Sequence, residues 1–206
     1  MVRTSPSLSV RGVIFDLDGT LVDSGLDFDA MRREMGLPPG QPLLEAIESL
    51  PEQEAQRCQA ILARHEWEGA NRATLMPGVA DFLGTLAERG VHRAIFTRNA
   101  RDVVLATLAR LALDFDTVVA REDAPAKPDP TAVWQICAAW QLAPSAVALI
   151  GDFRFDIEAG NRAGVRTVLY TAGAEPLPAH GALDADYCLR SFEDAGNLLA
   201  WLAEPL

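Results

Sequence analysis

Short apolar segments alternate with amphipathic segments along most of this chain. The apolar runs are too short for a helix core and are typical of buried strands; they occupy residues 13–15, 93–97, 117–120, 146–150 and 166–170. Apolar residues recur at helical spacing in residues 79–89, 100–111, 131–140 and 157–163. This alternation predicts an α/β fold, a Rossmann-like three-layer sandwich with a central parallel sheet. An edge strand at 187–189 and a final helix at 192–202 complete the expected order.

One long segment interrupts the alternation. Residues 26–75 are polar, rich in Glu and Arg, and show amphipathic helix spacing but no strand pattern. We therefore expect a small inserted α-helical cap domain at residues 24–76. Residues 1–23 and 77–206 then form the α/β core domain.

Composition narrows the classes of function. The 206 residues carry a formal charge of −11, which disfavours binding to nucleic acid or to an anionic membrane. Residues 1–11 lack the apolar core of a signal peptide, and no apolar run approaches 18 residues. The cysteines Cys58, Cys137 and Cys188 are odd in number and widely spaced, which favours reduced thiols in a cytoplasmic protein.

Polar side chains follow three of the expected strands. Asp16 and Asp18 come directly after the first strand, Thr97 ends the second, and Asp152 follows the strand at 146–150 with Asp156 close behind. Ligands of parallel α/β sheets bind beyond the carboxyl ends of the strands, so these groups are expected at one site. Neighbouring carboxylates raise each other's pKa unless a cation neutralises them, which makes a cation site the sharper interpretation. A solvated acidic turn is the plainer alternative for Asp16 and Asp18.

Lys127 is the only lysine among 18 basic residues. A chain that otherwise uses Arg for every cation can retain Lys where a compact ammonium is required and a planar guanidinium does not fit. Chance retention is the alternative explanation. If the first holds, Lys127 belongs to the same site as the carboxylates.

Taken together, these segments resemble the four motifs of the haloacid dehalogenase superfamily, in order. They are Asp16-Leu17-Asp18-Gly19-Thr20, then Thr97 ending a strand, then Lys127 before Pro128, then Gly151-Asp152 followed by Asp156. The resemblance covers about residues 12–171. It is nearest to the subgroup with a helical cap between the first two motifs, which includes phosphoglycolate phosphatase and β-phosphoglucomutase. The cap itself matches only in position and type.

The resemblance implies a role for each motif residue. Asp16 would be the nucleophile that forms an aspartyl-phosphate, and Asp18 the acid that protonates the leaving oxygen and then activates water. Mg²⁺ would be held by the Asp16 carboxylate, the Asp18 backbone carbonyl and Asp152, with Asp156 bound directly or through water, since hard oxygen ligands suit that ion. Thr97 and Lys127 would bind the transferred phosphoryl group.

Two positions depart from the family pattern. Arg98 stands between Thr97 and the Asn that usually follows it directly. It is a candidate for binding a distal anion of the substrate, with a solvent-facing side chain as the equal alternative. Phe153 replaces a small residue and either narrows the mouth of the pocket or packs against the cap.

The resemblance, together with the motif residues, implies a magnesium-dependent phosphohydrolase that acts on a small phosphorylated metabolite, as a monomer or homodimer. The alternatives are a sugar-phosphate mutase that uses the same intermediate, a binding protein without activity, and a dehalogenase, which usually lacks the second Asp of the first motif. In the cap, six side chains are candidates for touching substrate, with a solvated surface position the stronger expectation for each: Arg32, Arg33, His65, Trp67, Asn71 and Arg72.

Overall fold

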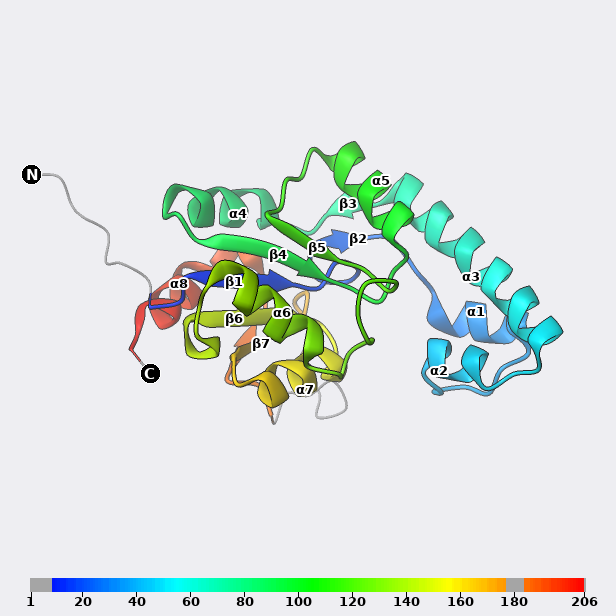
Figure 1. The fold of residues 1–206 in the computed structure, drawn as a ribbon. Helices are drawn as coiled ribbons and strands as arrows, with labels where there is room; N and C mark the ends of the chain where they lie inside the picture. Colours follow the sequence, from blue (N-terminus) through cyan, green and yellow to red (C-terminus); the bar gives the residue numbers. More distant parts are fainter. Residues whose placement is uncertain (1–8, 177–183, 206) are drawn as a thin grey trace, which may run out of the picture.

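The computed structural model describes residues 9–176 and 184–205. A six-stranded parallel sheet forms its centre (Figure 1). In spatial order the strands are β5 (Thr117–Val119), β4 (His92–Phe96), β1 (Gly12–Phe15), β6 (Val147–Gly151), β7 (Arg166–Tyr170) and β8 (Tyr187–Leu189). The fold thus confirms the expected α/β class and the strand at 187–189. Most of the segment examined for a signal peptide lies outside the described residues.

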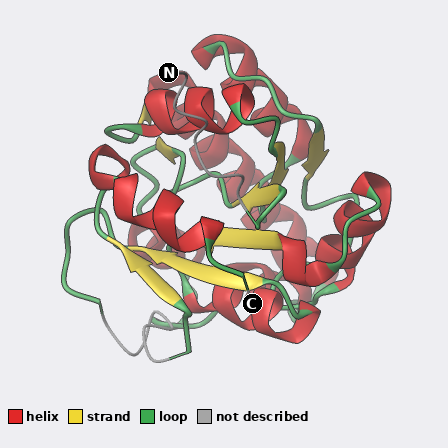
Figure 2. Ribbon diagram, turned by 90° about the vertical axis from the view of Figure 1, so that its left-hand side faces the viewer, coloured by secondary structure: helices red, strands yellow, loops and turns green. Residues whose placement is uncertain are grey.

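Helices cover both faces of this sheet (Figure 2). On one face, Phe15 packs in a core with residues of α4 (Val79–Glu88), α5 (Arg101–Leu111) and α8 (Gly196–Ala203). On the other face, Ile14 packs with residues of α6 (Thr131–Trp140) and α7 (Arg154–Ala163). Because successive side chains of a strand point to opposite faces, the apolar run of β1 supplies both cores and makes the strand central. This arrangement is the predicted three-layer sandwich.

Three helices between β1 and α4 form a separate group beyond the carboxyl ends of the strands (Figure 1). They are α1 (Phe28–Met35), α2 (Leu43–Glu48) and α3 (Glu52–Arg72), and they share an apolar core of their own. Their buried side chains lie at helical spacing, for example Met31 and Met35 on α1. We propose that residues 24–76 are a cap domain on a core formed by residues 1–23 and 77–206.

A short antiparallel ribbon joins this inserted segment to the sheet domain, which the sequence pattern did not predict. Strand β2 (Val22–Asp23) pairs with β3 (Thr74–Leu75), so that Val22 faces Leu75 and Asp23 faces Thr74. Two-residue strands are too short to produce a recognisable alternation of apolar and polar positions.

Two predicted boundaries also differ from the structure. Helix α7 begins at Arg154 instead of residue 157, because the Asp156 carboxylate accepts a hydrogen bond from the Phe153 amide and caps a polar first turn. The expected final helix is divided into a short 3-10 helix, Phe192–Asp194, and α8.

Within residues 9–176 and 184–205, no helix has both the length and the apolar character needed to span a bilayer.

Candidate active site

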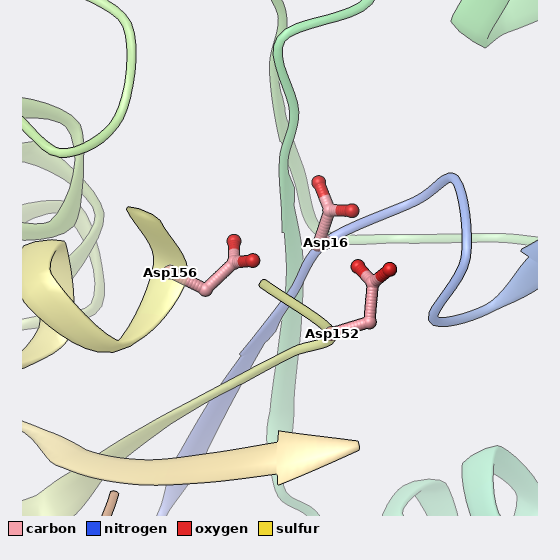
Figure 3. Close-up of side chains that lie close together, drawn as sticks. All are labelled: Asp16, Asp152 and Asp156. Carbon is pink, nitrogen blue, oxygen red and sulfur yellow. The ribbon is translucent and has the colours of Figure 1, made fainter. Parts of the chain in front are cut away.

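Three carboxylates meet at the carboxyl ends of the two central strands (Figure 3). Asp16 follows β1, Asp152 follows β6, and Asp156 lies in the first turn of α7. Each offers an oxygen that lies within 4.8 Å of the others. The Asp16 amide donates to the Ile150 carbonyl at 2.9 Å, so the pairing of the two strands continues up to the site. The parallel register therefore fixes the spacing of Asp16 and Asp152.

Two glycines make room for these carboxylates. A Cβ atom at Gly151 would lie 2.1 Å from the Asp156 carboxyl carbon, and one at Gly19 would lie 2.4 Å from an oxygen of Asp152. Gly19 also has a φ of +86°, a conformation that other residues rarely adopt. Both positions therefore require glycine, which has no Cβ atom, for the carboxylates to lie this close together.

Lys127 places its ammonium group within this cluster. It lies in the loop between β5 and α6, and its Nζ donates to Oδ1 of Asp16 at 2.5 Å and to Oδ1 of Asp156 at 2.6 Å. The side chain is almost fully buried. Three ionised carboxylates and one ammonium would leave two uncompensated negative charges in a buried place. A divalent cation would balance them, and an all-oxygen donor set is the kind that Mg²⁺ prefers.

The pKa shifts follow from this crowding. Burial raises the pKa of Asp16 well above its usual range, and Lys127 only partly opposes this effect. Burial, together with the charge of Asp156, raises the pKa of Asp152 to about 7. Burial alone would lower the pKa of Lys127, but the carboxylates of Asp156 and Asp16 outweigh burial and raise it. Lys127 therefore keeps its positive charge, but this single charge does not compensate the negative charges of the three carboxylates.

Asp18 faces a different set of partners. Its carboxylate accepts hydrogen bonds from Ser24 Oγ at 2.6 Å and from Asn99 Nδ2 at 2.8 Å. Burial nevertheless raises the pKa of Asp18, because it outweighs these two bonds. The side chain stands apart from the three-carboxylate cluster. The hydrogen bonds from Ser24 and Asn99 hold the Asp18 carboxyl group in one orientation. Because its pKa is raised, this group holds a proton at higher pH than an exposed carboxyl group.

Thr97 and Thr20 complete the polar shell. Thr97 follows β4 and is almost fully buried, and its Oγ1 accepts a hydrogen bond from the Asn99 amide at 3.1 Å. The hydroxyl of Thr20 donates to Oδ1 of Asp152 at 3.2 Å. Sequence reasoning gave no site role to Thr20, Ser24 or Asn99. The signal for Asn99 was its place two residues beyond Thr97, at the end of a strand.

Arg98, the residue between Thr97 and Asn99, contacts the inserted helices. Its Nη2 donates to both carboxylate oxygens of Glu45 on α2, at 2.7 and 2.6 Å. Its guanidinium also lies over the ring of Phe155, 4.9 Å from the ring centre. Neither sequence expectation for Arg98, a substrate anion or open solvent, included this ion pair.

All the predicted site residues line one cavity of about 650 Å³ between the sheet domain and the inserted helices. They are Asp16, Asp18, Thr97, Arg98, Lys127, Asp152 and Asp156. Phe153 lines it too and contacts Phe155 edge to face. Of the six cap candidates, Arg32 alone lines this cavity. The volume lies within the range of roughly 300–1,000 Å³ that is common for small-molecule sites.

A parallel sheet with carboxylates and a buried lysine at its carboxyl edge defines a Rossmann-like α/β enzyme. The model of the family of haloacid dehalogenase-like hydrolases matches residues 13–170. A haloacid dehalogenase-like hydrolase domain-containing protein of Arabidopsis thaliana is 32% identical over 96% of this chain and 87% of its own. The chain therefore belongs to the haloacid dehalogenase-like hydrolase family, as its motifs predicted.

Two further relatives agree with this result. Phosphoglycolate phosphatase of Pseudomonas putida is 28% identical over 97% of this chain and 82% of its own. A hydrolase of Pseudomonas syringae has a crystal structure that superposes with a TM-score of 0.78 at 21% identity, covering 94% of this chain and 100% of that one. The second likeness concerns the fold alone.

Proposed function

We propose that this chain is a magnesium-dependent phosphohydrolase that cleaves a small phosphorylated metabolite through an aspartyl-phosphate on Asp16. Its membership of the hydrolase family and the phosphatase among its relatives support the phosphatase class. One observation carries the proposal furthest. Asp16 belongs to the three-carboxylate cluster and at the same time accepts a hydrogen bond from Lys127. Such a carboxylate is held at a site that can also attract an anionic phosphate.

In this proposal Mg²⁺ is held by the carboxylates of Asp16, Asp152 and Asp156, with the backbone carbonyl of Asp18, and offsets negative charge near the reacting phosphate. Thr20 orients Asp152 through its hydroxyl. Lys127 holds one oxygen of Asp16, so the other oxygen is the one expected to attack phosphorus. Lys127 and the Thr97 hydroxyl stabilise the phosphoryl oxygens during transfer.

Asp18 is proposed as the acid and base. As the Asp16 oxygen bonds to phosphorus, the bond from phosphorus to the leaving oxygen breaks, and that oxygen takes the proton of Asp18. Asp18, now ionised, then accepts a proton from water, whose oxygen attacks phosphorus and releases Asp16 and inorganic phosphate. The raised pKa of Asp18 suits the first step, and its bonds to Ser24 and Asn99 keep it in position for the second.

The test is a screen of phosphorylated metabolites for phosphate release, with Mg²⁺ and with a chelator. We expect release that requires Mg²⁺ and a phospho-enzyme that can be trapped by acid. Absence of release from every compound would contradict the phosphatase proposal and favour a binding protein. Including a hexose 1-phosphate tests the mutase alternative, since a mutase would form the isomeric phosphate ester in place of free phosphate.

A further inference from the structure

Apolar side chains form much of the lining of the cavity. The inserted segment contributes six apolar side chains, namely Leu26, Phe28, Met31, Leu43, Leu44 and Leu62. From the sheet domain, Phe153 and Phe155 add two aromatic rings. Phe28 is 47% exposed and Phe153 is 39% exposed, so two of the large apolar side chains that remain exposed in the described chain border this one cavity. An apolar ligand group would cover such surface favourably.

Two of the three arginines that line this cavity are paired with carboxylates. Arg98 is bound by both oxygens of Glu45. Arg32 donates to Asp29 at 2.8 Å and to the Gln41 carbonyl at 2.8 Å. Glu45 and Asp29 offset the positive charges of these two guanidinium groups, which weakens their attraction for a substrate anion.

Arg154, the remaining arginine of the cavity, lies at an exposed position with its guanidinium over the Phe155 ring, 5.0 Å from the centre. On the inserted side the cavity is bordered by three carboxylates, Asp27, Asp29 and Glu66. Asp29 is paired with Arg32 and Glu66 with Arg121, so these pairs supply no net positive charge that would attract a second anionic group on a substrate whose phosphate is bound at Asp16. The charges therefore favour a neutral group in this space.

Building on the proposed function, we infer that the preferred substrate is a phosphate monoester of an uncharged, largely apolar group. A second carboxylate or phosphate on the substrate is disfavoured. The chemistry is the ordinary hydrolysis of such an ester, in which water supplies the hydroxyl of the phosphate product and the organic group leaves as an alcohol. This assignment differs from the carboxylate-bearing ester in the name of the Pseudomonas putida relative.

A matched pair of esters tests the inference. Butyl phosphate and 3-phosphooxypropanoate have similar lengths, and only the second carries a carboxylate. With Mg²⁺ present, we expect kcat/KM for butyl phosphate to be at least about tenfold higher. Over the series from ethyl to hexyl phosphate, kcat/KM should rise by up to about fourfold for each added methylene that is buried. Inorganic pyrophosphate, which carries a second phosphate in place of an apolar group, should be the poorest substrate of all these compounds.

The Glu45→Ala variant supplies a second test. Removing Glu45 frees the Arg98 guanidinium inside the cavity, so activity on 3-phosphooxypropanoate should rise relative to butyl phosphate by about threefold to tenfold. Glu48→Ala is the matched control, because Glu48 is an exposed residue of the same helix that does not line the cavity. Its ratio of the two kcat/KM values should equal that of the unmodified protein.

The outcomes separate the inference from the proposed function. Higher kcat/KM for 3-phosphooxypropanoate or pyrophosphate than for butyl phosphate overturns the inference and leaves the phosphatase proposal standing. An unchanged ratio in Glu45→Ala contradicts the argument that Arg98 is withheld from substrates. No phosphate release from any of these compounds, in a protein shown to be folded by circular dichroism, contradicts both.

Discussion

Glu66 of α3 and Arg121 of the loop after β5 form a two-pronged ion pair across the boundary between the inserted helices and the sheet domain. The two nitrogen–oxygen distances are 2.7 and 3.1 Å. Arg121 Nη1 also donates to the carbonyl of Arg98 at 3.4 Å. The pair thus joins one of the inserted helices to the segment that carries Thr97.

Replacing Arg121 by Met should destabilise the protein by about 2–4 kcal/mol, because the buried Glu66 carboxylate would lose its partner. Burial already raises the pKa of Glu66, and loss of the Arg121 charge would raise that pKa further. Urea unfolding measures the change. Arg190→Met is the control: its pair with Glu175 is exposed, so its loss should be within about 1 kcal/mol. Equal effects of the two variants would contradict this interpretation.

Asp16→Asn should reduce kcat by at least about a thousandfold, because a neutral amide does not attack phosphorus. The fold should remain, since the substitution keeps the side-chain shape and removes one of several crowded negative charges. The rate of phosphate release measures the loss of kcat, and circular dichroism checks that the fold remains. Asp114→Asn, an exposed position, controls for the change in net charge. Near-normal turnover by Asp16→Asn would falsify the nucleophile assignment.

Asp18→Asn should lower the rate by about 10²–10⁴-fold while allowing the aspartyl-phosphate to accumulate, because an amide cannot activate water. Acid quenching followed by mass spectrometry would show an added phosphoryl group on Asp16. The amide keeps one acceptor oxygen for Ser24 or Asn99, so stability should change little. If the phosphorylated fraction fell together with the rate, the second role of Asp18 would be wrong.

Lys127→Arg should be poorly tolerated, in both activity and stability. The ammonium is almost fully buried between Asp16 and Asp156, and a larger planar guanidinium does not fit in the same space. We expect a loss of at least about tenfold in kcat/KM. Arg93→Lys on β4, which lies outside the cavity, is the control for an exchange of these two residue types. Full activity of Lys127→Arg would mean that the retained lysine is an accident of composition.

Stability without metal should fall as the pH rises from about 4 to 7, in part because of Asp152. Its pKa is about 7 in the folded protein and 3.8 ordinarily, so in this window the folded state holds a proton that the unfolded chain has lost. In Asp152→Asn, this part of the decline, about 2–3 kcal/mol between pH 5 and 7.5, should be absent. Urea unfolding in a chelator measures both proteins. Identical pH profiles would contradict the raised pKa.

Adding Mg²⁺ at pH 7.5 should restore the lost stability of the unmodified protein, because the ion binds the ionised carboxylates of the folded state. Asp152→Asn, which lacks one of the proposed ligands, should gain less. A Mg²⁺ effect of equal size in both proteins would remove Asp152 from the proposed metal site.

The strands were predictable because each buried run was continuous and short, as in β1 and β6. The site residues were predictable because Asp16, Thr97 and Asp152 each stand directly after such a run, and a parallel sheet brings these points to one edge. The ribbon of β2 and β3 escaped prediction because a pairing of two residues on each side depends on contacts between distant parts of the chain.

The partners of the site residues were harder to foresee. Asn99 and Ser24 bind Asp18 from two different segments, and no spacing in the sequence connects them. The pairing of Arg98 with Glu45 joins residues 53 positions apart and depends on how the inserted helices lie on the sheet domain. Sequence patterns identify side chains suited to a reaction, but these distant contacts determine which of them are free to act.

The pairing of Asp23 with Thr74 means that the chain leaves and re-enters the sheet domain at adjacent points. Any replacement segment whose ends lie one strand spacing apart could close at the same place, whatever its length. The inserted segment, which lines part of the cavity, can therefore change in sequence and length without moving the carboxylates.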